Sequence, residues 1–172
     1  MGPAVAIAAG GVLAVVGAAL DWFTFTFAGP LGRMDRQVVN GIHLRSGKVV
    51  LAAGIVAILV GAAIFLVRER VAQLALSIIG LAAGAAAFGL SLHQAVTEKA
   101  RAVAEQVALA PVDQQDRIRQ LFRLRFATGA IEMSLRPGLV IALVGGAVAA
   151  LGAIVAVTQS AGGRTALPEP AS

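Results

Sequence analysis

The side chains able to bind a metal or transfer protons are few in this sequence and lie far apart in it. The chain has two histidines, nine acidic residues and no cysteine, which excludes disulfides and thiolate metal sites. Two histidines with a carboxylate would suit zinc, but they lack the close spacing of a His-x-x-x-His motif. The polar and aromatic residues predicted to gather on one face of the protein are Asp21, Trp22, His43, His93, Glu98 and Glu132. We expect them to form ordinary hydrogen bonds there, with no catalytic residue, cofactor or metal ion.

The elements that would position these residues are four long apolar segments. The chain is 58% hydrophobic and 13% charged, with a mean hydropathy of +0.85, whereas soluble domains carry about 25% charged residues. About 20 apolar residues let one helix cross the hydrocarbon layer of a bilayer. The expected spans cover about residues 4–22, 49–67, 71–95 and 138–158. The predicted fold class is therefore an all-α membrane protein, a bundle of four transmembrane helices.

The remaining residues divide into two polar loops and a tail. Residues 1–158 form a single four-span domain with polar loops at 23–48 and 98–136, and a small, polar tail at 159–172 is expected to be disordered. Only a short hairpin around Arg68 and Arg70 separates the second and third spans. The first helix is expected to run to about Asp21 and Trp22, with Trp22 as an anchor at the membrane interface. The third helix is expected to continue to Pro111.

The two long loops are expected to form a small cap on one membrane face. Phe23, Phe25 and Phe27 alternate with threonines, a period-two pattern that favours a short β-strand; the alternative is that these residues continue the first helix. Residues 117–126 fit either periodicity, because Phe122, Leu124 and Phe126 also alternate with arginines. We expect a helix there that becomes extended by about Leu124.

Glycines recur every seventh residue in the second and fourth spans. Residues 44–67 and 135–158 both begin Leu-Arg-x-Gly-x-Val and keep their glycines in register. This pattern predicts an internal repeat of two span-loop-span units related by an axis along the membrane normal; the alternative is that glycine-rich helices simply resemble one another. Small residues let helix backbones approach closely in a membrane. The glycines expected to pack helices together are Gly10, Gly17, Gly54, Gly61, Gly80, Gly84, Gly145 and Gly152.

The basic residues predict an orientation and a lipid contact. Eleven of the 14 Lys and Arg residues fall on the side of the two long loops. The positive-inside rule then places both loops in the cytoplasm and both termini on the other side of the cell membrane. Residues 117–125, from Arg117 to Arg125, are expected to meet anionic lipid headgroups. We expect no binding of nucleic acid, since the net charge of +5 serves orientation and lipid contact.

Two architectures resemble this sequence. The sequence resembles small four-span membrane proteins of unknown function from high-GC Gram-positive bacteria. The resemblance rests on an uncharged first span that ends in Asp-Trp with Phe-Thr alternation, on Asn-Gly and Ser-Gly-Lys before the second span, and on Arg-Pro-Gly-Leu before the last span. The plan of an extended cap on four helices also looks like the claudin type. The cysteine pair and the Gly-Leu-Trp of that family are absent here.

The function expected from these features is that of a non-enzymatic structural, interaction or accessory membrane protein. Its polar loops would bind a protein partner or further copies of the chain. Ionisable residues inside a membrane usually mark transport paths, and the spans have none at depth. A small oligomeric transporter or pore is therefore the second hypothesis, and an interfacial metal-dependent enzyme is the third.

Overall fold

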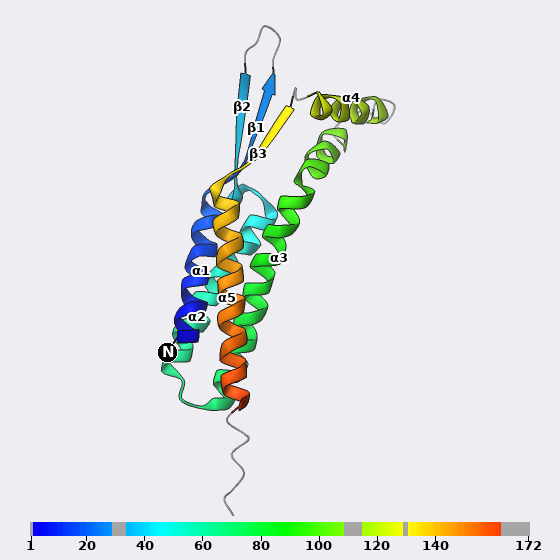
Figure 1. Ribbon diagram of the computed structural model, residues 1–172. Coiled ribbons are helices and arrows are strands. Elements are labelled where there is room, and N and C mark those ends of the chain that lie inside the picture. Colours follow the sequence, from blue (N-terminus) through cyan, green and yellow to red (C-terminus); the bar gives the residue numbers. More distant parts are fainter. Residues whose placement is uncertain (1, 29–33, 109–114, 129–130, 163–172) are drawn as a thin grey trace, which may run out of the picture.

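The computed structural model describes residues 2–28, 34–108, 115–128 and 131–162. Within them, four helices are long and apolar enough to cross a membrane, as predicted. The elements in chain order are α1 (Gly2–Ala19), β1 (Asp21–Ala28), β2 (Met34–Asn40), the 3-10 turn η2 (Gly41–His43), α2 (Arg45–Leu66), α3 (Arg70–Ala108), α4 (Gln115–Ala127), β3 (Ile131–Leu135) and α5 (Pro137–Gly162). The sheet and α4 lie at one end of the long helices, and the α2–α3 hairpin lies at the other (Figure 1).

The four long helices pack in the cyclic order α1, α5, α3, α2, with little contact across the two diagonals. Small residues fill most of the space between them, and the larger apolar side chains buried there are Ile7, Val50, Val60 and Leu139. In a lipid environment the association of such helices depends on close packing, because lipid tails are as apolar as the side chains. The absence of bulky side chains at these contacts lets the backbones come close.

All eight glycines predicted to pack helices are buried. An added Cβ at Gly10 would lie 2.4 Å from the backbone nitrogen of Ala149, and one at Gly145 would lie 2.5 Å from that of Ala14. Gly80 is the loosest of the eight, since its nearest neighbour would be a side-chain carbon of Val60 at 3.2 Å. At the other seven positions, a side chain would have to separate two elements of the fold.

The two matching glycine series both face α1. Gly54 and Gly61 of α2 lie against Gly11 and Ala8 of α1, and Gly145 of α5 lies against the opposite flank of the same helix. The predicted repeat relates α1 to α3 and α2 to α5 by a two-fold rotation. Since the α2 glycines face α1, that rotation would make the α5 glycines face α3. The internal repeat stays a prediction, and these contacts do not follow the two-fold relation that it implies.

The three strands form one antiparallel sheet in the order β2-β1-β3. This confirms the strand predicted from the Phe-Thr alternation, because Phe25 pairs with Gln37 on one side and Met133 on the other. The register shifts between Asp21 and Phe23, so Trp22 is an extra residue on β1. Neighbouring residues normally face opposite sides of a sheet, and a bulge breaks that alternation. Trp22 and Phe23 are consequently both buried.

Three predicted boundaries were wrong. Helix α1 ends at Ala19 instead of continuing to Trp22, because the chain pairs with β2 from Asp21 onward. Helix α4 stays helical past Leu124, whose carbonyl accepts a hydrogen bond from the backbone of Thr128 at 2.8 Å. Arginine and leucine are good helix formers, and this preference outweighs the local alternation. Helix α5 extends to Gly162, so residues 159–162 are ordered in a helix, and the rest of the predicted tail lies outside the described residues.

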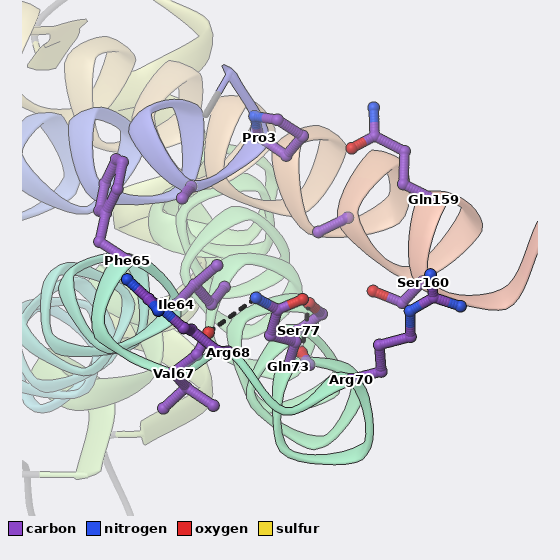
Figure 2. A pocket seen from close by; sticks show the side chains of 12 residues that line it. Pro3, Ile64, Phe65, Val67, Arg68, Arg70, Gln73, Ser77, Gln159 and Ser160 are labelled. Atoms are coloured by element: carbon purple, nitrogen blue, oxygen red, sulfur yellow. Dashed lines mark hydrogen bonds between the residues drawn. The ribbon is translucent and has the colours of Figure 1, made fainter. Parts of the chain in front are cut away.

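The hairpin end of the bundle is open. Helix α3 follows α2 after Val67, Arg68 and Glu69, which matches the predicted short connection. Gln73 closes the hairpin, since its side-chain amide donates to the carbonyl of Val67 at 2.7 Å. Between the helix ends lies a cavity of about 390 Å³, to which all four long helices contribute residues (Figure 2).

Candidate functional site

The predicted polar residues lie at the sheet end of the molecule, on separate elements. Asp21 begins β1, His43 ends η2, His93 lies on α3 and Glu132 lies on β3, and all four are exposed. Glu98 belongs to α3, and its side chain lies outside the described residues. Of the five predicted residues whose side chains the structure describes, only Trp22 is buried.

These residues do not converge on one point. Across the part of the chain that the structure describes, no group of three His, Asp or Glu side chains is close enough to hold a metal ion. Residues on the surface of separate elements also lack the mutual hydrogen bonds that would set a base beside a nucleophile.

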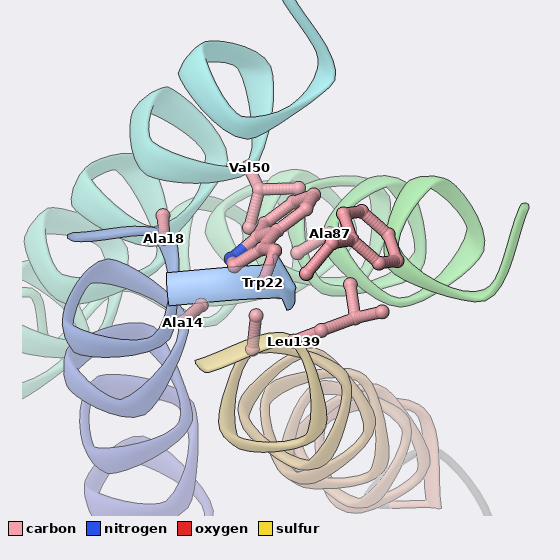
Figure 3. Close-up of a cluster of buried hydrophobic side chains, with 8 residues drawn as sticks. Ala14, Ala18, Trp22, Val50, Ala87 and Leu139 are labelled. Atoms are coloured by element: carbon pink, nitrogen blue, oxygen red, sulfur yellow. The ribbon is translucent and has the colours of Figure 1, made fainter. Parts of the chain in front are cut away.

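Trp22 sits where the sheet meets the four helices. Its ring packs among residues from all of them: Ala14 and Ala18 of α1, Val50 of α2, Ala87 of α3 and Leu139 of α5 (Figure 3). The indole Nε1–H donates to the carbonyl of Gly17 at 2.8 Å, and the ring meets Phe23 edge-on. The prediction that Trp22 anchors the chain at the membrane interface was wrong. The bulge in β1 turns the ring inward, where it closes the end of the bundle.

Two sets of hydrogen bonds tie the base of the sheet to the helices around Trp22. On the β3 side, the Arg136 backbone N–H donates to the carbonyl of Trp22 at 2.9 Å, and its Nε donates to the Thr24 hydroxyl at 2.6 Å. On the β2 side, the amide of Asn40 donates to the carbonyl of Ala19 at 2.8 Å. We call these residues with Trp22 the collar: Trp22, Thr24, Asn40 and Arg136.

Gly41 explains how α2 reaches the collar. A Cβ at Gly41 would lie 2.5 Å from the Nε1 atom of Trp22 and from the carbonyl oxygen of Ala18. A Cβ at Gly47 of α2 would in turn overlap the carbonyl of Gly41 at 1.9 Å. Glycine is required at both positions, because a side chain at Gly41 would collide with the Trp22 ring and the Ala18 carbonyl, and one at Gly47 would collide with the Gly41 backbone. The Asn40-Gly41 pair thus serves close packing at the end of β2.

A buried polar pair joins α2 and α3 near the collar, and sequence reasoning missed it. The amide of Gln94 donates to the Ser46 hydroxyl, while its Oε1 atom and the nearby Ser91 hydroxyl have no hydrogen-bond partner among the described residues. Gln94 and Ser91 are fully buried. A search for charged residues passes over neutral amides and hydroxyls. The sequence signal for this buried polar pair was the spacing of Ser91 and Gln94, which lie three residues apart and therefore on the same face of α3.

Comparison with known proteins adds no assignment. No protein-family model matches this chain, and no curated protein matches it. What the site can do must be argued from its geometry. The collar joins neutral polar groups to the half-buried Arg136, and Asp21, His43, His93 and Glu132 lie on the surface.

Beyond the collar, α4 has an exposed face of mixed apolar and basic side chains. Arg117, Leu121, Leu124 and Arg125 are all exposed and fall within one side of the helix. We call these four residues the α4 stripe. Arg119 belongs to another face, where it pairs with Asp116 at 3.4 Å. The α4 stripe therefore combines exposed apolar and basic side chains on one surface.

Proposed function

We propose that this chain is a non-enzymatic, multi-pass integral membrane protein that holds its sheet and α4 in water as a binding surface for a protein partner. The supporting observation is the collar, which fastens the base of the sheet to all four long helices while the α4 stripe and Val38 stay exposed. Ordered elements with exposed apolar and charged side chains lose little entropy on binding.

The height of α4 favours a protein partner over the bilayer. The apolar part of α3, Arg70–Thr97, is 28 residues long, about 42 Å at 1.5 Å per residue, which matches a bilayer with its headgroups at about 40–45 Å. Residues 98–108 then extend the helix by about 16 Å. The Debye length at physiological ionic strength is about 8 Å. With α3 upright, the arginines of α4 are too far from headgroups for strong attraction, so an acidic protein segment replaces the lipid contact expected from the sequence.

The other two hypotheses receive less support. A pore through one copy would need space along the bundle axis, and there the described interior is filled by Trp22 at the collar and by Ile7 and small residues below it. An interfacial metal enzyme would need His43 and His93 to converge, and both are exposed on separate elements. A homo-oligomer stays compatible with the proposal, since a second copy is one kind of protein partner.

The proposed orientation places the sheet and α4 in the cytoplasm and the hairpin with both termini on the other side. It rests on the excess of Lys and Arg in the long loops. Single cysteines at Gln115 and Ser160 test it, because the chain has no other cysteine. A membrane-impermeant reagent on intact cells should label Ser160→Cys and leave Gln115→Cys unmodified. The reverse pattern would invert the orientation, and labelling of both would contradict four spans.

Site-specific photo-crosslinking tests the binding surface. A photoreactive amino acid at Leu124, which is 61% exposed on α4, is compared with one at Leu59, which is 63% exposed on α2 within the membrane span. We expect a discrete protein crosslink from Leu124 in native membranes, weakened by Arg117→Glu with Arg125→Glu, and lipid adducts from Leu59. Crosslinks from Leu124 to lipid alone would contradict the proposed protein partner.

A further inference from the structure

The hairpin end carries a cavity that the proposed function does not use. The first turn of α1, the end of α2, the start of α3 and the end of α5 each contribute residues to it. Its volume of about 390 Å³ lies within the range of small-molecule sites, roughly 300–1,000 Å³. The cavity therefore opens at the hairpin end of the bundle, where all four long helices begin or end.

The wall of this cavity is basic and polar on the α3 side. Arg68 and Arg70 both line it, together with Gln73 and Ser77 of α3 and Gln159 and Ser160 of α5. In Figure 2 the two arginines lie on either side of Gln73. Glu69 stands between them in the sequence and is not among the lining residues.

The two arginines are held at this place by the hairpin. Gln73 donates to the carbonyl of Val67, its backbone N–H donates to the carbonyl of Glu69 at 3.0 Å, and the Ser77 hydroxyl donates to the carbonyl of Gln73 at 2.7 Å. These bonds fix both ends of the three-residue connection. Guanidinium groups bind phosphate through paired, charge-assisted hydrogen bonds. Chemically, this wall fits a phosphate.

A second hollow adjoins the first on the outer surface of the bundle. It is a groove of about 410 Å³ between α1 and α5, lined almost entirely by apolar residues that include Ala6, Val148, Leu151 and Val155. Pro3 and Gln159 line both the cavity and the groove. The two hollows therefore meet, one polar and basic, the other apolar and facing the lipid.

We propose that the cavity and the groove together bind one anionic phospholipid. The phosphate lies between Arg68 and Arg70, and an acyl chain follows the groove along α1 and α5. The level of the site agrees with this occupant, because Arg70 begins the span segment of α3 and would therefore lie in the headgroup layer. A free phosphate would use the cavity and leave the groove without a role, whereas a phospholipid fills both.

Binding is tested on the full chain, purified in mild detergent and stripped of lipid. Three probes are added separately: a dioleoyl phosphatidylglycerol, the zwitterionic phosphatidylcholine with the same chains, and water-soluble glycerol phosphate. A ligand that binds only the folded state raises the unfolding temperature. We expect the anionic phospholipid to raise it and to appear as one bound molecule in native mass spectrometry, with no comparable effect of the other two probes.

Two variants and one control locate the site. Arg68→Gln with Arg70→Gln should weaken binding roughly tenfold or more, since each charge-assisted hydrogen bond is strong. Val155→Trp should fill the groove and also weaken it. Arg45→Gln with Lys48→Gln removes two exposed cations at the other end of α2 and should leave binding unchanged. Each temperature shift is measured against the same variant without lipid, so a change in basal stability does not enter.

Several outcomes would overturn this proposal. An equal response to glycerol phosphate would show a free-anion site, and an equal response to phosphatidylcholine would show unspecific lipid contact. Retained binding after loss of both arginines, or equal loss in the Arg45 and Lys48 control, would place any lipid elsewhere. None of these results bears on the partner of α4, which is tested at the opposite end of the molecule.

Discussion

The two ends of the helix bundle are built in opposite ways. At the sheet end, Trp22 fills the space between all four helices, and Arg136 and Asn40 bond to backbone or side chains that are distant in sequence. At the hairpin end, the same four helices leave a cavity of about 390 Å³ flanked by exposed arginines. The bonds around that cavity are local, within the hairpin and the first turns of α3.

This difference indicates that the sheet end contributes mainly to stability and that the hairpin end is the more suitable place for a ligand. Arginine serves the fold where its hydrogen bond reaches a buried group, as between Arg136 and Thr24. Exposed arginines contribute little to stability, because solvent and salt screen them. Substitutions in the collar should therefore lower the stability of the protein, whereas substitutions of Arg68 and Arg70 should change the proposed lipid binding.

The largest effect is expected from a glycine of the α1–α5 contact. Gly145→Leu would force a side chain against the backbone of α1, where even a Cβ has only 2.5 Å, and should cost about 3 kcal/mol of stability. Gly89→Leu is the matched control, since an added Cβ at Gly89 meets nothing within 4 Å. There the better helix propensity of leucine should stabilise by roughly 0.5–1 kcal/mol. Thermal unfolding in detergent measures both, and equal losses would contradict glycine-mediated packing.

A smaller loss is expected when the collar ring is reduced. Trp22→Phe removes the shorter of two hydrogen bonds to the Gly17 carbonyl, which keeps the one from the Leu20 backbone N–H at 3.3 Å. It also leaves space among the helices, and the two losses together should cost about 2 kcal/mol. Phe65→Leu at the hairpin end replaces an aromatic ring that is 48% exposed. The stability of this variant should stay within about 0.5 kcal/mol of that of the parent protein. Intrinsic fluorescence cannot follow the first variant, because the chain has a single Trp; circular dichroism on heating serves for both.

Arginine substitutions compare the two ends directly. Arg136→Gln removes the bond to the buried Thr24 hydroxyl and should cost about 1.5 kcal/mol, with faster amide hydrogen exchange along β3. Arg70→Gln should change stability by less than about 0.5 kcal/mol when no lipid is present. If both variants lost the same stability, the proposed division between the two ends would be wrong.

The smallest effect is expected from the buried polar pair. Replacing both partners, with Ser46→Ala and Gln94→Met, removes a hydrogen bond and also the unpaired Oε1 atom of Gln94. Removal of both partners of a buried bond is often nearly neutral, so stability should stay within about 0.5 kcal/mol. A large loss would show that Gln94 makes a further bond in solution.

The sequence was sufficient for elements whose signal is repeated along the chain. Four apolar segments of membrane length and the alternation of Phe23, Thr24 and Phe25 each predicted the observed element, because each depends on many residues that agree. The glycine positions were also visible, since spacing alone puts them on one face. The sequence did not show that the glycines of α2 and those of α5 would both face α1, because the cyclic order of the helices is a tertiary property.

Single-residue events were beyond sequence reasoning. The bulge that turns Trp22 inward depends on pairing with β2, eighteen residues away at Asn40, and no local pattern marks it. The sequence around Leu124 fits both a helix and a strand, and the structure shows a helix, in which the Thr128 backbone N–H donates to the Leu124 carbonyl. The hairpin cavity was missed because its walls come from four helices, each with only a few polar residues at its end.

The contact of α1 with α5 has a consequence for how the protein is made. Ribosomes deliver α1, β1, β2 and α2 first, so these segments can pair while the rest is still being synthesised. One glycine flank of α1 and one edge of β1 then wait for β3 and α5, which come last and cover both. A chain interrupted before β3 would leave that edge of β1 unpaired and that flank of α1 uncovered. Membrane chaperones and proteases recognise such features, so truncated chains should be removed while complete ones persist.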